Sequence, residues 1–199
     1  MASLFSLEGP VYKYMKYLYA LMILNAMWML FSIPIFTFGA STTALFKAIG
    51  RLLRDEQGVI ALDYINDMKD CFKETTLIWL LLLLCDSVLC FNLMFGLNMI
   101  PVGLSWIQVP ILFQLILIHM YVFLLMARFE VKGLLAIKTA WIVGNRYLLI
   151  SIGVMGSSIV LFNMSLYVPA SQFLLLGSLI GLMIYRLTEP LCSAIENTE

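Results

Sequence analysis

The chain alternates between long hydrophobic runs and short charged connectors. A helix of about 20 apolar residues can cross the hydrocarbon core of a bilayer, and several runs approach this length. The pattern predicts an all-α fold, a polytopic transmembrane helical bundle that forms one membrane domain over residues 1–199. We expect five strong spans and one short return or half-helix, which together cover residues 17–33, 35–50 (the return helix), 76–97, 107–127, 147–168 and 172–187.

Pro34 and Gly39 interrupt the first hydrophobic stretch and act as a hinge. Proline removes a backbone donor and disfavours helix at the residue before it, while glycine permits a sharp turn. The hydroxyl side chains at 41–43 can then cap a second helix. If residues 35–50 return through the membrane, the chain crosses six times and the N-terminus lies inside. Without a return, it crosses five times and the N-terminus lies outside.

Two charged connectors, over residues 55–75 and 128–146, carry apolar side chains at helical spacing. In the first connector these side chains alternate with acidic ones, and they are Leu62, Ile65, Met68 and Phe72. In the second they are Leu134, Ile137 and Trp141. Helices of this kind lie on a membrane surface or against other helices. We therefore expect both connectors to be amphipathic helices.

The distribution of Lys and Arg predicts the orientation. Basic residues mark cytoplasmic connectors. Both charged connectors carry them, whereas the loops at 98–106 and 169–171 carry none. We expect the connectors and the C-terminal tail on the cytoplasmic side. The six-crossing arrangement places all 12 basic residues there, so it is the one that we favour.

Composition agrees with a membrane protein and argues against several functions. Hydrophobic residues make up 62% of the chain and charged residues 12%, with a mean hydropathy of +0.98. A soluble domain is nearer to about a quarter charged, so we expect the lipid bilayer as the main partner. The formal net charge of zero argues against nucleic acid, which needs a basic face. The sequence does not determine the oligomeric state.

The sequence offers little support for catalysis or metal binding. Its four cysteines, at positions 71, 85, 90 and 192, form no CxxC pair, and no histidine stands at ligand spacing from them. A GxSxG nucleophile motif, an HExxH motif and a glycine-rich phosphate loop are absent. We therefore expect no metal, no cofactor and no enzymatic activity.

Asp86 is the most unusual side chain of the hydrophobic runs, because a charged residue at the centre of a bilayer costs roughly 2.5–3.5 kcal/mol. It stands 16 residues before Val102, in the middle of an uncharged loop, and His119 stands 17 residues after Val102. In a tight antiparallel hairpin the two would share a depth and could relay protons or bind a cation. Our hypothesis is that they pair. The alternative is a protonated Asp86 bonded to Asn92 or Asn25, with His119 satisfied separately. The candidate intramembrane polar site comprises Asp86, His119, Asn25, Asn92 and Gln114.

Small residues at four-residue spacing indicate positions of close helix packing. Gly177 with Gly181, and Gly153 with Ser157, have this spacing. Such pairs let helix backbones approach each other. We favour contacts within the chain over dimerisation.

Two segments resemble a known family. Residues 25–34 read NAMWMLFSIP and residues 37–45 read TFGASTTAL, and both are similar to the opening of the YesL-like family of small bacterial integral membrane proteins. The resemblance covers residues 5–76, and the remainder agrees only in hydropathy and length. It implies a multi-pass protein of the bacterial plasma membrane, of unknown function, from a family often encoded beside carbohydrate ABC-transporter components. It implies no catalytic residues.

Two functions follow from these observations. The first is a non-enzymatic accessory protein of a carbohydrate ABC-transport system, whose subunits would be its partners. The second is a small proton- or ion-coupled transporter that uses Asp86 and His119.

Overall fold

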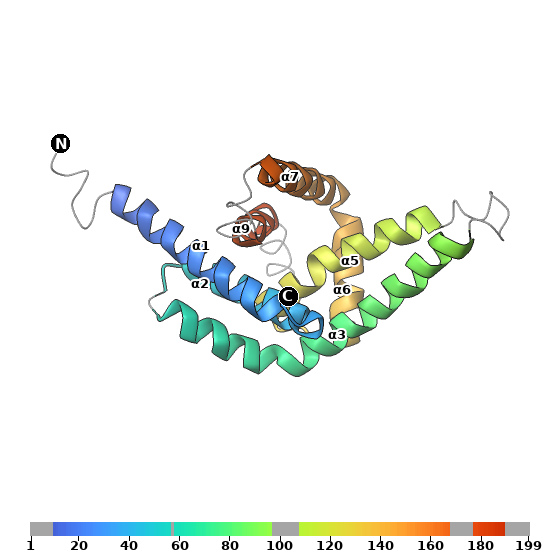
Figure 1. Cartoon of the computed structure of the whole chain (residues 1–199), viewed down its shortest axis with the longest axis horizontal. Coiled ribbons are helices and arrows are strands. Elements are labelled where there is room, and N and C mark those ends of the chain that lie inside the picture. Colours follow the sequence, from blue (N-terminus) through green and yellow to red (C-terminus); the bar gives the residue numbers. More distant parts are fainter. Residues whose placement is uncertain (1–9, 57, 97–107, 168–176, 190–199) are drawn as a thin grey trace.

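The computed structural model describes residues 10–56, 58–96, 108–167 and 177–189, and this part of the chain contains helices and no strands. The elements are, in chain order, α1 (Pro10–Ser32), the 3-10 turn η2 (Ile35–Thr37), α2 (Phe38–Leu53), α3 (Ile60–Gly96), α5 (Gln108–Phe129), α6 (Leu134–Arg146), α7 (Leu148–Tyr167) and α9 (Gly177–Leu187). They form an all-α bundle, as predicted (Figure 1).

Three described helices are long and apolar enough to cross a membrane, over Tyr14–Ser32, Ile60–Met94 and Gln108–Phe129. A fourth span is possible if α6 and α7, which meet at 95°, are counted as one broken span. These helices mark the chain as a membrane protein. The expected spans at 147–168 and 172–187 extend into residues outside the described part, where α9 supplies only a short apolar helix.

The predicted hinge is present, and it produces a helical hairpin. Helix α1 ends at Ser32, Pro34 is extended, and α2 starts at Phe38 after η2. Hydroxyl groups satisfy the interrupted backbone, because Oγ1 of Thr37 lies 2.7 Å from the carbonyl oxygen of Pro34. At the other end of the hairpin, Nζ of Lys16 is 3.3 Å from a carboxylate oxygen of Asp55. The two helices therefore run antiparallel.

Helix α2 is the central element of the bundle. It contacts α1, α3, α5 and α9, and its residues Ala40, Ala44 and Ile49 are fully buried. Its hydroxyl side chains bond to the neighbours: Ser41 is 2.7 Å from the hydroxyl of Tyr64 on α3. At about 1.5 Å per residue its 16 residues measure about 24 Å. The return helix is thus present but shorter than a full bilayer crossing of about 30 Å.

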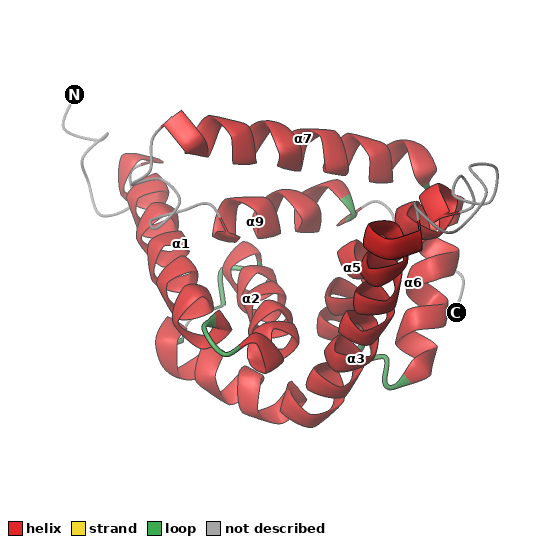
Figure 2. Cartoon of the chain, turned by 45° about the vertical axis from the view of Figure 1, so that its right-hand side comes forward, coloured by secondary structure: helices red, strands yellow, loops and turns green. Residues whose placement is uncertain are grey.

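Helix α3 corrects one expectation. The connector at 55–75 and the span at 76–97 were expected as separate elements, but Ile60–Gly96 is one helix of 37 residues. The reason is that no proline occurs in this range and the first glycine is Gly96 itself. The helix is bent near its middle (Figures 1 and 2). Within the same helix the hydroxyl of Thr75 donates to the carbonyl oxygen of Cys71 at 2.7 Å, an interaction that often bends helices.

The second connector folds back along α5. Glu130 and Gly133 both adopt positive φ angles, of 52° and 58°, and reverse the chain between α5 and α6. Gly144 on α6 then lies against Leu117 and Tyr121 on α5. The helix expected over 128–146 is thus packed against a predicted span. Beyond it, α7 crosses over the other helices at the top of Figure 2.

Candidate functional site

Asp86 on α3 and His119 on α5 lie together. Nε2 of His119 is 3.2 Å from Oδ2 of Asp86. The side chains are 43% exposed for Asp86 and 25% exposed for His119, so the pair lies at the edge of the described bundle. The structure therefore brings together the two residues that were expected to pair across the α3–α5 hairpin.

His119 is held in place by its own helix. Its Nδ1 atom is 2.9 Å from the carbonyl oxygen of Leu115, one turn earlier. A carbonyl oxygen can only accept a hydrogen bond, so Nδ1 is the donor. This contact fixes the orientation of the imidazole and directs Nε2 towards Asp86.

Trp79 connects this pair to the helix break after Pro34. Its ring is perpendicular to the imidazole of His119, with 5.9 Å between the ring centroids. Its Nε1 atom donates to the carbonyl oxygen of Ile35 in η2 at 2.6 Å. The ring of Phe38, at the start of α2, is 4.8 Å away. Trp79 thus contacts both the helix break after Pro34 and the imidazole of His119.

The other residues of the candidate polar site lie elsewhere. Asn25 on α1 is fully buried, and its Oδ1 accepts the backbone N–H of Ser178 on α9 at 3.2 Å. Gln114 on α5 forms two hydrogen bonds of 2.9 Å with Asn145 on α6. Asn92 is exposed on α3. These amides are not part of the Asp86–His119 site.

The predicted packing glycines divide into two groups. A methyl group on Gly177 would come within 2.6 Å of the Trp28 ring on α1, and one on Gly181 within 2.9 Å of Ile49 on α2. Both glycines therefore lie at helix contacts within the chain. Gly153 differs, because no described atom other than the neighbouring backbone of α7 lies within 4 Å of the corresponding position. The hydroxyl of Ser157 bonds to the Gly153 carbonyl oxygen at 2.8 Å, within the same helix.

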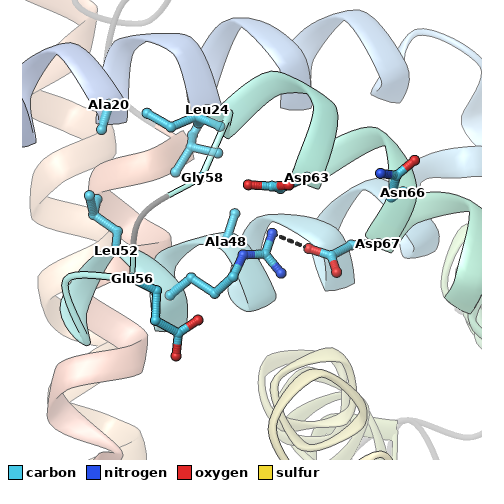
Figure 3. Close-up of a pocket in the computed structure, with 11 residues that line it drawn as sticks. Ala20, Leu24, Ala48, Leu52, Glu56, Gly58, Asp63, Asn66 and Asp67 are labelled. Atoms are coloured by element: carbon cyan, nitrogen blue, oxygen red, sulfur yellow. Dashed lines mark hydrogen bonds and ion pairs between the residues drawn. The ribbon is translucent and has the colours of Figure 1, made fainter.

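A pocket of about 300 Å³ lies between α1, α2 and the first turns of α3 (Figure 3). Ala20 and Leu24 give it an apolar wall. On the opposite side Arg51 forms an ion pair with Asp67. The hydrogen bond to Asp67 raises the pKa of Arg51, and the charge of Asp63 adds to the effect. Figure 3 shows Asp63 and Asp67 projecting from α3 towards α2.

Two more clefts continue from this pocket, the first sharing residues with the pocket and the second sharing Lys47 and Glu130 with the first. One, of about 390 Å³, has both Arg51 and Asp67 in its lining, together with residues of α5 and α9. In it the guanidinium carbon of Arg128 lies 5.3 Å from the centre of the Tyr185 ring. The other, of about 250 Å³, lies beside Lys47. We call the charged side chains that line the three clefts the charged cluster, and they are Lys47, Arg51, Arg54, Glu56, Asp63, Asp67, Asp70, Glu74, Arg128, Glu130 and Lys132.

Sequence reasoning missed three contributors to these sites. Trp79 was read only as part of a span, although an indole needs an acceptor when it is buried. Asn145 was assigned to a connector, and its amide pairing with Gln114 depends on α6 folding back. The pairing of Arg51 with Asp67 depends on the antiparallel packing of α2 and α3, which spacing alone does not predict.

The described residues contain no group of three or more His, Cys, Asp or Glu side chains that could hold a metal ion. Within the same part of the chain, Cys71, Cys85 and Cys90 are free thiols. The charged features of this part of the structure are the contact between Asp86 and His119 and the charged cluster.

Part of the chain is similar to a described family. Residues 21–93 match a family model whose description is "Protein of unknown function, DUF624". The match covers a little over a third of the chain. It includes the hinge, α2, the Arg51–Asp67 pair and Asp86. No curated protein and no solved structure matches the chain.

Proposed function

We propose that this chain is a non-enzymatic accessory protein of the bacterial plasma membrane that works with a carbohydrate ABC-transport system. The DUF624 match overlaps the segment that resembles the YesL-like proteins, and that resemblance suggests the transport system. The observation that carries the proposal is the charged cluster. An apolar bundle that gathers so many charges in open clefts at one region presents a surface for a polar partner.

The contacts around the charged cluster agree with a cytoplasmic position. The N-terminal part of α1 lies near the cluster, because Lys16 pairs with Asp55, which stands between Arg54 and Glu56 of the cluster. The last turn of α9 joins it through Tyr185, whose hydroxyl lies beside Gly50. Both ends of the described chain thus lie on the side that carries the basic connectors. By the positive-inside rule, a cytoplasmic subunit of a transporter could reach this surface, and both termini would be cytoplasmic.

Purification from native membranes in a mild detergent, with mass spectrometry of the proteins that accompany the chain, tests this function. We expect subunits of a carbohydrate ABC transporter. Replacing Glu130 and Lys132 by oppositely charged residues should reduce their recovery at least tenfold, because complementary charges in an interface determine partner choice. Replacing the exposed Lys138 by Glu on α6, outside the clefts, provides the control. Recovery that is equal in both variants would remove the charged cluster from the proposal.

A second candidate function is a small proton- or ion-coupled transporter. The specific observation in its favour is the 3.2 Å contact between His119 and Asp86 within two candidate spans. Ionisable residues inside a membrane commonly mark a pathway for ions or protons. Proteoliposomes would show proton-dependent solute flux, and Asp86→Asn should abolish it. Flux that survives in Asp86→Asn would exclude this mechanism.

A further inference from the structure

The contacts of His119 determine how many hydrogens the Asp86–His119 pair can hold. Nδ1 carries one hydrogen, because it donates to the Leu115 carbonyl oxygen. Nε2 faces a carboxylate oxygen of Asp86 at 3.2 Å. This contact is attractive only when one further hydrogen lies between the two atoms. That hydrogen is either on an imidazolium beside a carboxylate or on a carboxylic acid beside a neutral imidazole.

Both arrangements have a net charge of zero, which is the favourable state in a membrane. Removing the hydrogen leaves two lone pairs facing each other and an uncompensated negative charge on Asp86. A charged residue without a partner is costly in a bilayer. The pair therefore has one loaded, neutral state and one unloaded, charged state that differ by a single proton.

The surroundings of the imidazole favour a proton over a metal ion as the ligand. The perpendicular ring next to it belongs to Trp79, and the centre of the Phe123 ring lies 6.1 Å from the centre of the Trp79 ring. Asp86 is the charged side chain that the described structure places in contact with His119. One carboxylate and one ring nitrogen supply only two of the four protein ligands that a structural zinc site takes.

Trp79 gives this pair a link to the rest of the fold. Its indole N–H is fixed on the Ile35 carbonyl oxygen at 2.6 Å, and Gly39 brings the α2 backbone close to its Cβ atom. The ring that packs on the imidazole is therefore anchored on the helix break after Pro34. A movement of the helix break would therefore move the Trp79 ring, and a movement of the imidazole would displace the ring and, through it, the break.

We propose that Asp86 and His119 form a one-proton binding site and that Trp79 is its positioning residue, which ties the imidazole to the break between α1 and α2. This site does not depend on the docking role of the charged cluster, because no residue is shared between them. It would serve either candidate function, as a coupling site in a transporter or as a proton-dependent element in an accessory protein.

His119 is the single histidine of the chain, which makes a direct experiment possible. The full chain is produced with ¹⁵N-labelled histidine, reconstituted in lipid nanodiscs and examined by NMR between about pH 5 and pH 8, where histidine usually changes its charge. In the unaltered chain we expect Nδ1 to stay protonated and Nε2 to show the resonance of a nitrogen that shares a hydrogen. In Asp86→Asn at about pH 8, where an isolated imidazole is neutral, the Nε2 resonance should be that of an unprotonated nitrogen. Identical Nε2 resonances in the two proteins would overturn the one-proton site.

The same spectra test the role of Trp79. Trp79→Phe keeps a ring beside the imidazole but loses the donor to Ile35, so we expect the Nδ1 and Nε2 signals to split or broaden as the ring samples several orientations. Trp141→Phe is the matched control, because Trp141 is half exposed on α6, and its spectrum should equal that of the unaltered chain. If Trp79→Phe lowers the thermal stability but leaves both nitrogen resonances unchanged, Trp79 is a packing residue and the positioning role is wrong.

Discussion

Helices α2 and α7 show opposite relations between composition and burial. Helix α2 carries three hydroxyl side chains, Lys47 and Arg51, and most of its residues are buried. Helix α7 carries no charged residue, yet Leu149 is 88% exposed and several other apolar side chains of the same helix are exposed too. In a water-soluble protein the more apolar helix would occupy the interior. Here the more polar helix does, which is the arrangement expected when lipid is the solvent.

The physical reason is that lipid offers no hydrogen-bond partners. Polar groups in a membrane must be satisfied by protein, and α2 has partners both on the surrounding helices and along its own backbone. The Ser41 hydroxyl reaches the Trp28 carbonyl oxygen at 3.1 Å, and Thr43 bonds to the Gly39 carbonyl oxygen within its own helix at 2.9 Å. Helix α7 needs few partners on other helices, because most of its exposed side chains are apolar and the exposed Asn163 bonds within α7. Close packing is therefore essential for α2 and dispensable along much of α7.

The largest expected effect comes from replacing one glycine in each helix by alanine. A methyl group on Gly39 of α2 would lie 2.7 Å from Trp79 Cβ and 2.8 Å from the Thr75 carbonyl oxygen, so α2 and α3 would have to move apart. We expect Gly39→Ala to destabilise the chain by roughly 3 kcal/mol, at the upper end of typical overpacking costs. Thermal unfolding in detergent micelles measures this difference.

Gly153→Ala on α7 is the matched control for this experiment. The position is open, and alanine favours a helix over glycine by about 1 kcal/mol, so we expect no loss or a small gain in stability. Equal losses for Gly39→Ala and Gly153→Ala would show that α7 is packed as closely as α2, and the contrast between the two helices would be wrong.

The sequence predicts the packed part of this contrast better than the exposed part. Pro34 and Gly39 predict the hairpin, because each has a strong local effect on the backbone. The count from Val102 to Asp86 and His119 predicts their proximity, because a short loop fixes the register of two helices. The bend of α3 is harder to predict from the sequence, because no proline or glycine interrupts the helix before Gly96. A threonine such as Thr75, whose hydroxyl bonds to the Cys71 carbonyl oxygen, is a much weaker signal. The position of Asn145 depends on how α6 folds back, which periodicity does not encode.

The second largest expected effect is the loss of stability when the charge of Arg51 on α2 is removed. The Arg51–Asp67 pair is largely shielded, with side chains 26% and 15% exposed. Loss of a hydrogen bond to a charged group costs about 2 kcal/mol, so Arg51→Gln should destabilise the chain by about this amount. The loss should shrink in the background of Asp67→Asn, because contacting residues couple. Chemical unfolding in detergent would measure both values.

Lys16→Gln supplies the exposed counterpart. Lys16 and Asp55 are 53% and 57% exposed, and such pairs contribute less than about 1 kcal/mol. A loss for Lys16→Gln as large as that for Arg51→Gln would mean that burial of the pair beside α2 does not determine its contribution. If the loss of stability in the double variant equals the sum of the losses in Arg51→Gln and Asp67→Asn, the two side chains do not interact.

The smallest effect tests whether an amide matters only where it joins two helices. Gln114 on α5 bonds to Asn145 on α6, whereas Asn163 is exposed on α7 and bonds to the Ile159 carbonyl oxygen of its own helix at 2.9 Å. Hydrogen bonds between membrane helices contribute about 0.6 kcal/mol on average, so Gln114→Leu should cost about this much and Asn163→Leu should cost nothing measurable. Adding Asn145→Leu to Gln114→Leu should recover part of the loss, because no amide is then left without its partner. Thermal unfolding of the four proteins in one detergent would decide this, and a loss in Asn163→Leu equal to that in Gln114→Leu would show that polarity alone, rather than contact between helices, sets the stability of this bundle.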